Sequence, residues 1–62
     1  MSKKIGVELL VDNHGQLVDE EGFYYETYFT NENEAYAYCY SSKGKFVYPL
    51  VDSNGNNVWA VD

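Results

Sequence analysis

Arginine is absent from this 62-residue chain, and cysteine, histidine, proline and tryptophan occur once each. A single cysteine, Cys39, cannot form an intramolecular disulfide, and no cysteine pair suggests a zinc site. A long hydrophobic run is missing too, because Glu8 interrupts the apolar residues behind the first lysines, so we expect no signal peptide and no membrane span. These absences favour a soluble protein in a reducing cytoplasm.

Basic residues are the scarcest class: four lysines face ten acidic residues, giving a formal net charge of -6 at pH 7. No lysine lies between Ile5 and Ser42. Because binding to phosphates relies on Lys and Arg, we expect no direct binding to nucleic acid or to an anionic membrane. The acidity favours a larger partner protein with a basic surface. The alternative is that it only keeps a small protein in solution.

The length allows one compact domain, residues 1–62, which buries only about 60% of the surface of the unfolded chain. Aromatic residues make up 18% of the chain. Each large ring removes roughly 150–250 Å² from water when it is buried. We therefore expect a core built from Tyr, Phe, Val and Leu.

An Asp-x-x-Gly segment occurs twice, as LVDNHG over 10–15 and as LVDSNG over 50–55. A calcium loop of the EF-hand type needs glycine at position 6 and a bidentate Glu at position 12. Here the glycine is the fourth residue, and the position 12 counted from Asp12 is Phe23, so the pattern excludes that metal site. Asp and Asn followed by Gly instead predict a type I turn closed by a glycine bulge, which joins antiparallel strands.

Residues 5–11, 22–29, 46–51 and 58–61 have the composition of strands. In the aromatic segment 22–29, a period of two separates an inward face from an outward face. The inward face holds Phe23, Tyr25, Thr27 and Phe29; the outward face holds Tyr24, Glu26 and Tyr28. Pro49 lacks an amide donor and predicts an edge strand or a bulge.

Residues 31–43 fit two structures. As a helix, the segment has Asn31 and Glu34 at capping-box spacing, acids in the first turn and Gly44 as a stop. As a strand, it alternates tyrosines with small residues and ends in a third hairpin turn at 41–44. We favour the helix, because the signals at its two ends agree.

The expected fold is therefore α+β: a small antiparallel sheet of four to five strands with one helix, about 31–43, packed on one face. The alternative is an all-β meander.

Catalysis is not expected. His14 lies in a predicted turn without a nucleophile beside it, and Cys39 has no neighbouring base. The chain contains no phosphate-binding loop, dinucleotide fingerprint or Cys/His cluster. We expect neither an enzyme nor a cofactor.

What remains is the pairing of tyrosine with acid, since tyrosine offers a large, rigid contact area for partners. We predict a small acidic protein-binding module that inhibits or decoys a larger host enzyme, with nucleic-acid mimicry and a phage or mobile-element origin as extensions. Alternatives are a self-associating assembly protein, such as a homodimer, and a small-ligand sponge formed by oligomerisation. The candidate partner-binding residues are Asp19, Glu20, Glu21, Tyr24, Glu26, Tyr28, Glu32 and Glu34.

Overall fold

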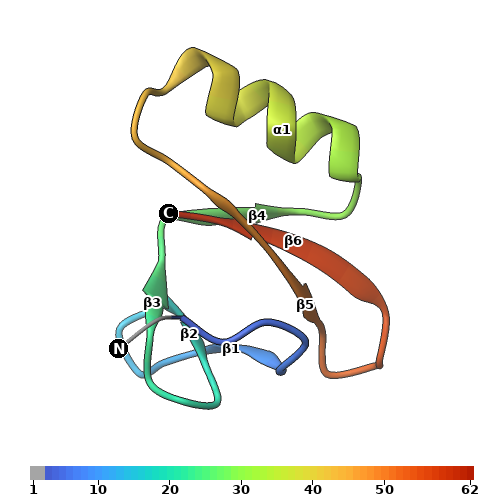
Figure 1. Cartoon of the computed structure of the whole chain (residues 1–62). Coiled ribbons are helices and arrows are strands. Elements are labelled where there is room, and N and C mark those ends of the chain that lie inside the picture. The colour runs from blue at the N-terminus through green and yellow to red at the C-terminus, as the bar shows by residue number, and fades with distance from the viewer. Residues whose placement is uncertain (1–2) are drawn as a thin grey trace.

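A computed structural model describes residues 3–62, which form two three-stranded antiparallel sheets and one helix (Figure 1). The elements are β1 (Leu9–Val11), β2 (Leu17–Asp19), β3 (Tyr24–Tyr25), β4 (Thr27–Phe29), α1 (Glu32–Ser41), β5 (Val47–Val51) and β6 (Asn57–Val61). The predicted α+β class and its single helix are confirmed, and the all-β meander is wrong. The sequence predicts one sheet of four to five strands, whereas the structure has two sheets, ordered β1-β2-β3 and β4-β6-β5.

The aromatic segment belongs to both sheets. Tyr24 and Tyr25 pair with β2, whereas Thr27 to Phe29 pair with β6, and the amide of Glu26 between them donates to the carbonyl of Val61 at 2.9 Å. The predicted alternation continues through this junction, because Tyr25 is buried while Tyr24 and Tyr28 are exposed. One predicted strand is thus two short strands that change sheets at Glu26.

The N-terminal segment joins the sheets a second time. The amide of Gly6 donates to the Pro49 carbonyl at 2.7 Å, and the amide of Val51 donates to the Val7 carbonyl at 3.1 Å. Residues 6–8 therefore run along β5, and the expected strand over 5–11 is regular only from Leu9 onward. β5 is the outer strand of its own sheet, as Pro49 predicted, and the N-terminal segment covers its free edge.

Three hairpin turns share one hydrogen-bond pattern, and only two of them are predicted from the repeated Asp-x-x-Gly segment. Oδ1 of Asp12 accepts from the amides two and four residues later at 2.9 and 2.8 Å, and Oδ1 of Asp52 does the same at 2.9 Å for each. Asp19 repeats the pattern at 2.8 and 3.1 Å in the turn that joins β2 to β3. The glycine three residues after each aspartate has a positive φ and donates to its carbonyl. The third turn lies at 19–22, not at 41–44.

Helix α1 begins as its capping signals predicted, with the Asn31 side chain accepting from the Glu34 amide at 3.2 Å. Ala35, on the inner side of the helix, is fully buried. The ring of Tyr38 lies 5.6 Å from that of Phe29 in β4. The helix packs on the β4-β6-β5 sheet (Figure 1), and its short inner residues allow this close approach.

The core lies between the two sheets and is built around Tyr25, Leu50, Val58 and Ala60. The rings of Tyr25 and Tyr48 meet edge to face at 5.6 Å. Partly buried hydrophobic side chains from the first sheet and the N-terminal segment pack against this cluster. Among residues 3–62, no helix has the length and apolar character needed to cross a membrane.

Candidate partner-binding surface

The predicted partner-binding residues do not share one surface. Glu20, Glu21 and Tyr24 are exposed around the first sheet, whereas Glu32 and Glu34 are exposed in the first turn of α1. Asp19 is buried, and Glu26 and Tyr28 occupy two further environments described below. The structure therefore brings together only part of the set that proximity in the sequence suggested.

The outer side of the first sheet carries an apolar stripe across all three strands. The register pairs Leu10 with Val18 and Val18 with Tyr24. Their strand neighbours Leu9, Leu17 and Tyr25 pack inward, so side-chain alternation turns these three outward. Leu10 is 39% exposed and Tyr24 is 50% exposed, and Val18 between them is half-buried. We call Leu10, Val18 and Tyr24 the outer stripe.

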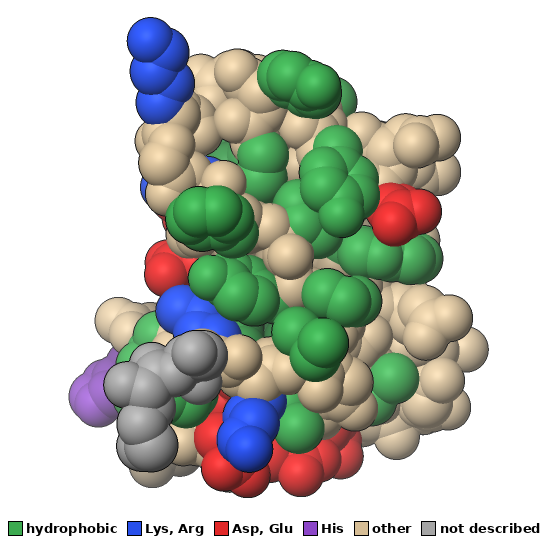
Figure 2. All heavy atoms as spheres, in the orientation of Figure 1, with side chains coloured by type: hydrophobic (Ala, Val, Ile, Leu, Met, Phe, Trp, Pro, Cys, Tyr) green, Lys and Arg blue, Asp and Glu red, His purple; other side chains and the backbone are tan. Residues whose placement is uncertain are grey.

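Carboxylates lie at both ends of the strands that carry the outer stripe. At one end, Oε1 of Glu20 accepts from the amide of Glu8 at 3.1 Å, which holds that carboxylate against the backbone leading into β1. At the other end, Asp12 lies in the turn between β1 and β2, where its Oδ1 accepts from the amide of Gln16 at 2.8 Å. The pKa of Asp12 lies below its usual range, first because the Gln16 amide donates to it, with His14 and Tyr24 adding to the effect. Figure 2 shows acidic side chains gathered at the lower end of the molecule, where this sheet lies.

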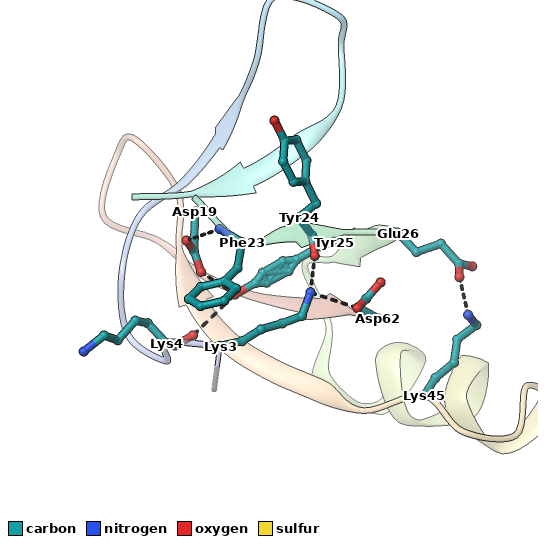
Figure 3. A network of polar contacts seen from close by, with 9 residues as sticks. All are labelled: Lys3, Lys4, Asp19, Phe23, Tyr24, Tyr25, Glu26, Lys45 and Asp62. Atoms are coloured by element: carbon teal, nitrogen blue, oxygen red, sulfur yellow. Dashed lines mark hydrogen bonds and ion pairs between the residues drawn. The ribbon is translucent and has the colours of Figure 1, made fainter. Parts of the chain in front are cut away.

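Asp19 is an internal anchor of the fold (Figure 3). It is 2% exposed, and its Oδ2 accepts from the hydroxyl of Tyr25 at 2.6 Å. Burial by itself would raise the pKa of Asp19, but the hydrogen bonds from Tyr25, Phe23 and other donors of the turn outweigh it and lower that pKa. Burial, followed by the hydrogen bond to Asp19 and its charge, raises the pKa of Tyr25. Asp19 therefore has no oxygen free for a partner. Its Asp-x-x-Gly spacing with Gly22 was the signal that could have identified it as a turn residue.

The carboxylate of Glu26 already has two partners within the chain. Its carboxylate pairs with the ammonium of Lys45 and accepts from the hydroxyl of Tyr38, linking the strand junction to α1 and the segment before β5. The hydrogen bond from Lys45 is the largest cause of the lowered pKa of Glu26, and that from Tyr38 is the next. A partner at this position would compete with two internal donors.

The ammonium of Lys3 also has its partners within the chain. Its ammonium pairs with the Asp62 carboxylate at 2.8 Å, donates to the carbonyl of Tyr24 and lies 4.5 Å from the centre of the Tyr25 ring (Figure 3). This lysine therefore ties the N-terminal segment to Asp62, and it contacts the backbone of Tyr24 and not its side chain.

Tyr28 lines a groove that Leu10 of the outer stripe also lines. The groove has a volume of about 180 Å³ and is bounded by β1, Leu17, Tyr28, Asp52 and Ser53. Small-molecule sites usually measure about 300–1,000 Å³. A groove of this size fits a single side chain better than a whole ligand.

His14 and Cys39 lie on different elements of the fold. His14 is exposed at the tip of the first hairpin turn, where its amide donates to Asp12. Cys39 is half-buried on α1 beside Tyr36 and Tyr40. Across residues 3–62, no group of three or more His, Cys, Asp or Glu side chains could hold a metal ion.

Comparisons with protein-family models, with curated proteins and with solved structures find no match to this chain.

Proposed function

We propose that this protein is an acidic protein-binding module. It acts as an inhibitor or a decoy by placing the outer stripe and the nearby carboxylates on the basic surface of a larger protein. The observation that supports this is the in-register apolar row Leu10, Val18 and Tyr24, which lies on the solvent side of a sheet with acids at both ends. A sheet that only covered its own core would need no such row, because polar residues usually take the outer positions.

The composition of this surface suits binding. A tyrosine that is half exposed brings ring area and a hydroxyl at low conformational cost, and such rings are frequent energetic centres of interfaces. The surrounding carboxylates raise the rate of encounter with a basic partner and select against acidic ones. A standard interface takes about 800 Å² from each partner. That is roughly a fifth of the 4337 Å² that this chain exposes, so one face is large enough.

A basic partner surface of this kind could itself be a phosphate-binding surface. Carboxylates on a rigid sheet edge present negative charge in fixed positions, which is the property through which an acidic protein competes with a polyanion. We therefore propose decoy activity toward such a partner as the specific form of inhibition.

The experiment is a capture from bacterial lysate at low salt, eluted with a salt gradient, using the intact protein and two matched charge variants. Glu20→Gln with Glu21→Gln removes two charges near the outer stripe, and Gln at 20 can still accept from the Glu8 amide. Glu32→Gln with Glu34→Gln removes two charges from α1 and serves as the control. We expect the first pair to release the same partner at lower salt and the control pair to behave as the native chain does.

Tyr24→Ala tests the apolar half of the surface. We expect it to weaken the complex by about 2 kcal/mol, in the range of an interface hot spot, without changing the salt dependence. Equal weakening by both charge pairs would show that overall acidity, and not this face, recruits the partner. Retention of full affinity by Tyr24→Ala would remove the outer stripe from the proposal.

A further inference from the structure

A second exposed aromatic surface lies on α1, away from the outer stripe. Tyr40 is 92% exposed and Tyr36 is 48% exposed, one helical turn apart on the same side of the helix. Phe46, in the segment that leads to β5, is 65% exposed. Figure 2 shows hydrophobic and tyrosine side chains gathered on the face where α1 and β5 lie. Burial of even part of this area would stabilise a complex.

The surface is hollowed at its centre. Tyr36, Cys39 and Tyr40 line a depression of about 230 Å³. The opposite flank of the helix carries Tyr38, which packs on Phe29 and bonds Glu26, while Ala35 faces the sheet. The fold therefore uses one flank of α1 internally, and the flank with the depression faces solvent.

Charges of opposite sign stand at the two ends of this surface. Glu32, four residues before Tyr36 on the same side of the helix, is exposed in the first turn of α1, and Lys43 is exposed just after its last turn. Glu34 is four residues before Tyr38 and lies on the other flank. Figure 2 shows a lysine projecting at the left end of the helix and an acidic side chain near its right end. Lys45 does not share this role, since it pairs with Glu26. The surface is thus self-complementary when a second helix lies antiparallel to the first.

We infer that α1 is a homodimer interface, in which a second copy of the chain packs its helix antiparallel across a two-fold axis. Such an axis makes every contact occur twice, so each Lys43 meets the acidic first turn of the other copy at both ends of the interface. Tyr40 of each copy enters the depression of the other. An axis midway between Tyr36 and Tyr40 passes within about one residue of Cys39, a shift of ~1.5 Å along the helix.

The principal test is sedimentation of the full chain over a range of concentrations. We expect a reversible dimer for the native protein and a monomer for Tyr40→Glu, because a charge is then placed in the apolar depression. Tyr24→Glu, on the outer stripe, is the control and keeps the native dimer. A native chain that stays monomeric at its highest soluble concentration would overturn the inference, as would a dimer that survives Tyr40→Glu.

A charge exchange tests the orientation without altering the aromatic surface. Lys43→Glu should weaken the dimer by roughly three- to tenfold, since like charges then face each other twice. Adding Glu32→Lys to that variant should restore the native constant. No response to Lys43→Glu, or no recovery in the double variant, would contradict the antiparallel packing even if Tyr40→Glu were to unfold the chain.

Crosslinking locates the axis. A short bis-maleimide should join two native chains through Cys39 at concentrations where the dimer forms, and Cys39→Ser should abolish the product. A sedimenting dimer that the reagent does not join would place the axis elsewhere. The dimer and the proposed partner complex fail separately, because Tyr40→Glu leaves the outer stripe intact and Tyr24→Glu leaves α1 intact.

Discussion

The turns at Asp19 and Asp52 have the same backbone hydrogen bonds, yet they lie in opposite surroundings. Each aspartate accepts from the amides two and four residues later, and each is followed by a glycine with positive φ. Asp52 sits in an exposed hairpin turn between β5 and β6. Asp19 is buried and holds the hydroxyl of Tyr25, a residue of the core. One local pattern can therefore shape a turn alone or connect a turn to the core.

The largest expected effect comes from Asp19→Ala. Alanine removes two charge-assisted bonds to amides and leaves the buried Tyr25 hydroxyl without its main acceptor, a loss of about 3 kcal/mol or more. A chain of 62 residues has a total stability of roughly 3–9 kcal/mol, so this variant should lose about a third of it or more. Asp52→Ala should lose less than half as much. Urea unfolding followed by circular dichroism measures both, and equal losses would mean that the contact with Tyr25 contributes nothing.

Acid should destabilise the fold in part through the same carboxylate. The folded state lowers the pKa of Asp19 below its ordinary value of about 3.9. Its contribution to stability is therefore complete above that value and is lost as the pH falls through the folded pKa. The lowered pKa values of Asp12 and Asp52 act in the same direction.

We expect Asp19→Asn to show a smaller loss of stability than the native chain between about pH 6 and about pH 2. The measurement is the free energy of unfolding at several pH values for the native chain, Asp19→Asn and Asp52→Asn. A steeper acid response in Asp19→Asn than in Asp52→Asn would contradict the assignment.

Tyr25→Phe isolates the single contact that distinguishes the two turns. It removes a hydrogen bond to a charged group at 2.6 Å and keeps the ring, so it should cost about 1.5–3 kcal/mol. The pKa of Asp19 should rise in this variant, because a hydrogen bond to its charged form is lost. Carboxyl chemical shifts during an NMR titration report that change. An unaltered Asp19 pKa would show that the amides alone determine it.

The smallest effects, and the most similar ones, should come from the turn glycines. Gly22 and Gly55 have φ of 90° and 83°, and an added Cβ at either would meet no atom within 4 Å. Alanine there should cost about 1–2 kcal/mol, the strain of a left-handed residue, in both turns alike. Thermal unfolding of Gly22→Ala and Gly55→Ala tests this. A clear difference between the two would mean that even the backbone conformation of these turns depends on the core.

Much of the fold could be read from short-range signals. Asn31 and the acids after it predict the start of the helix, and that capping contact is present. The hairpin turns at Asp12 and Asp52 followed from Asp and Gly at fixed spacing. The alternation of the aromatic segment also held, with Tyr25 inside and Tyr24 outside. Each of these signals lies within eight consecutive residues, so no distant contact was needed to interpret it.

The candidate surface was harder to predict, because closeness in sequence is not closeness in space. Tyr24 and Tyr28 alternate to the same outward side of one segment, but the chain changes sheets at Glu26 between them. One tyrosine then joins the outer stripe and the other lines the groove. Leu10 and Val18 belong to that stripe only because the register sets Val18 beside Tyr24 and Leu10 beside Val18. No feature of their own composition marks them.

The sequence by itself determined the local geometry: where turns form, where the helix begins, and that the surface is acidic. These properties depend on side-chain bonds to neighbouring backbone and on net charge, which are present in any fold of this chain. Only the tertiary structure decided which carboxylates reach solvent. Burial beside Tyr25 made Asp19 an internal anchor, because a core has to satisfy every polar group that it encloses. Glu26 stays exposed, but the fold brings Lys45 and Tyr38 to its carboxylate.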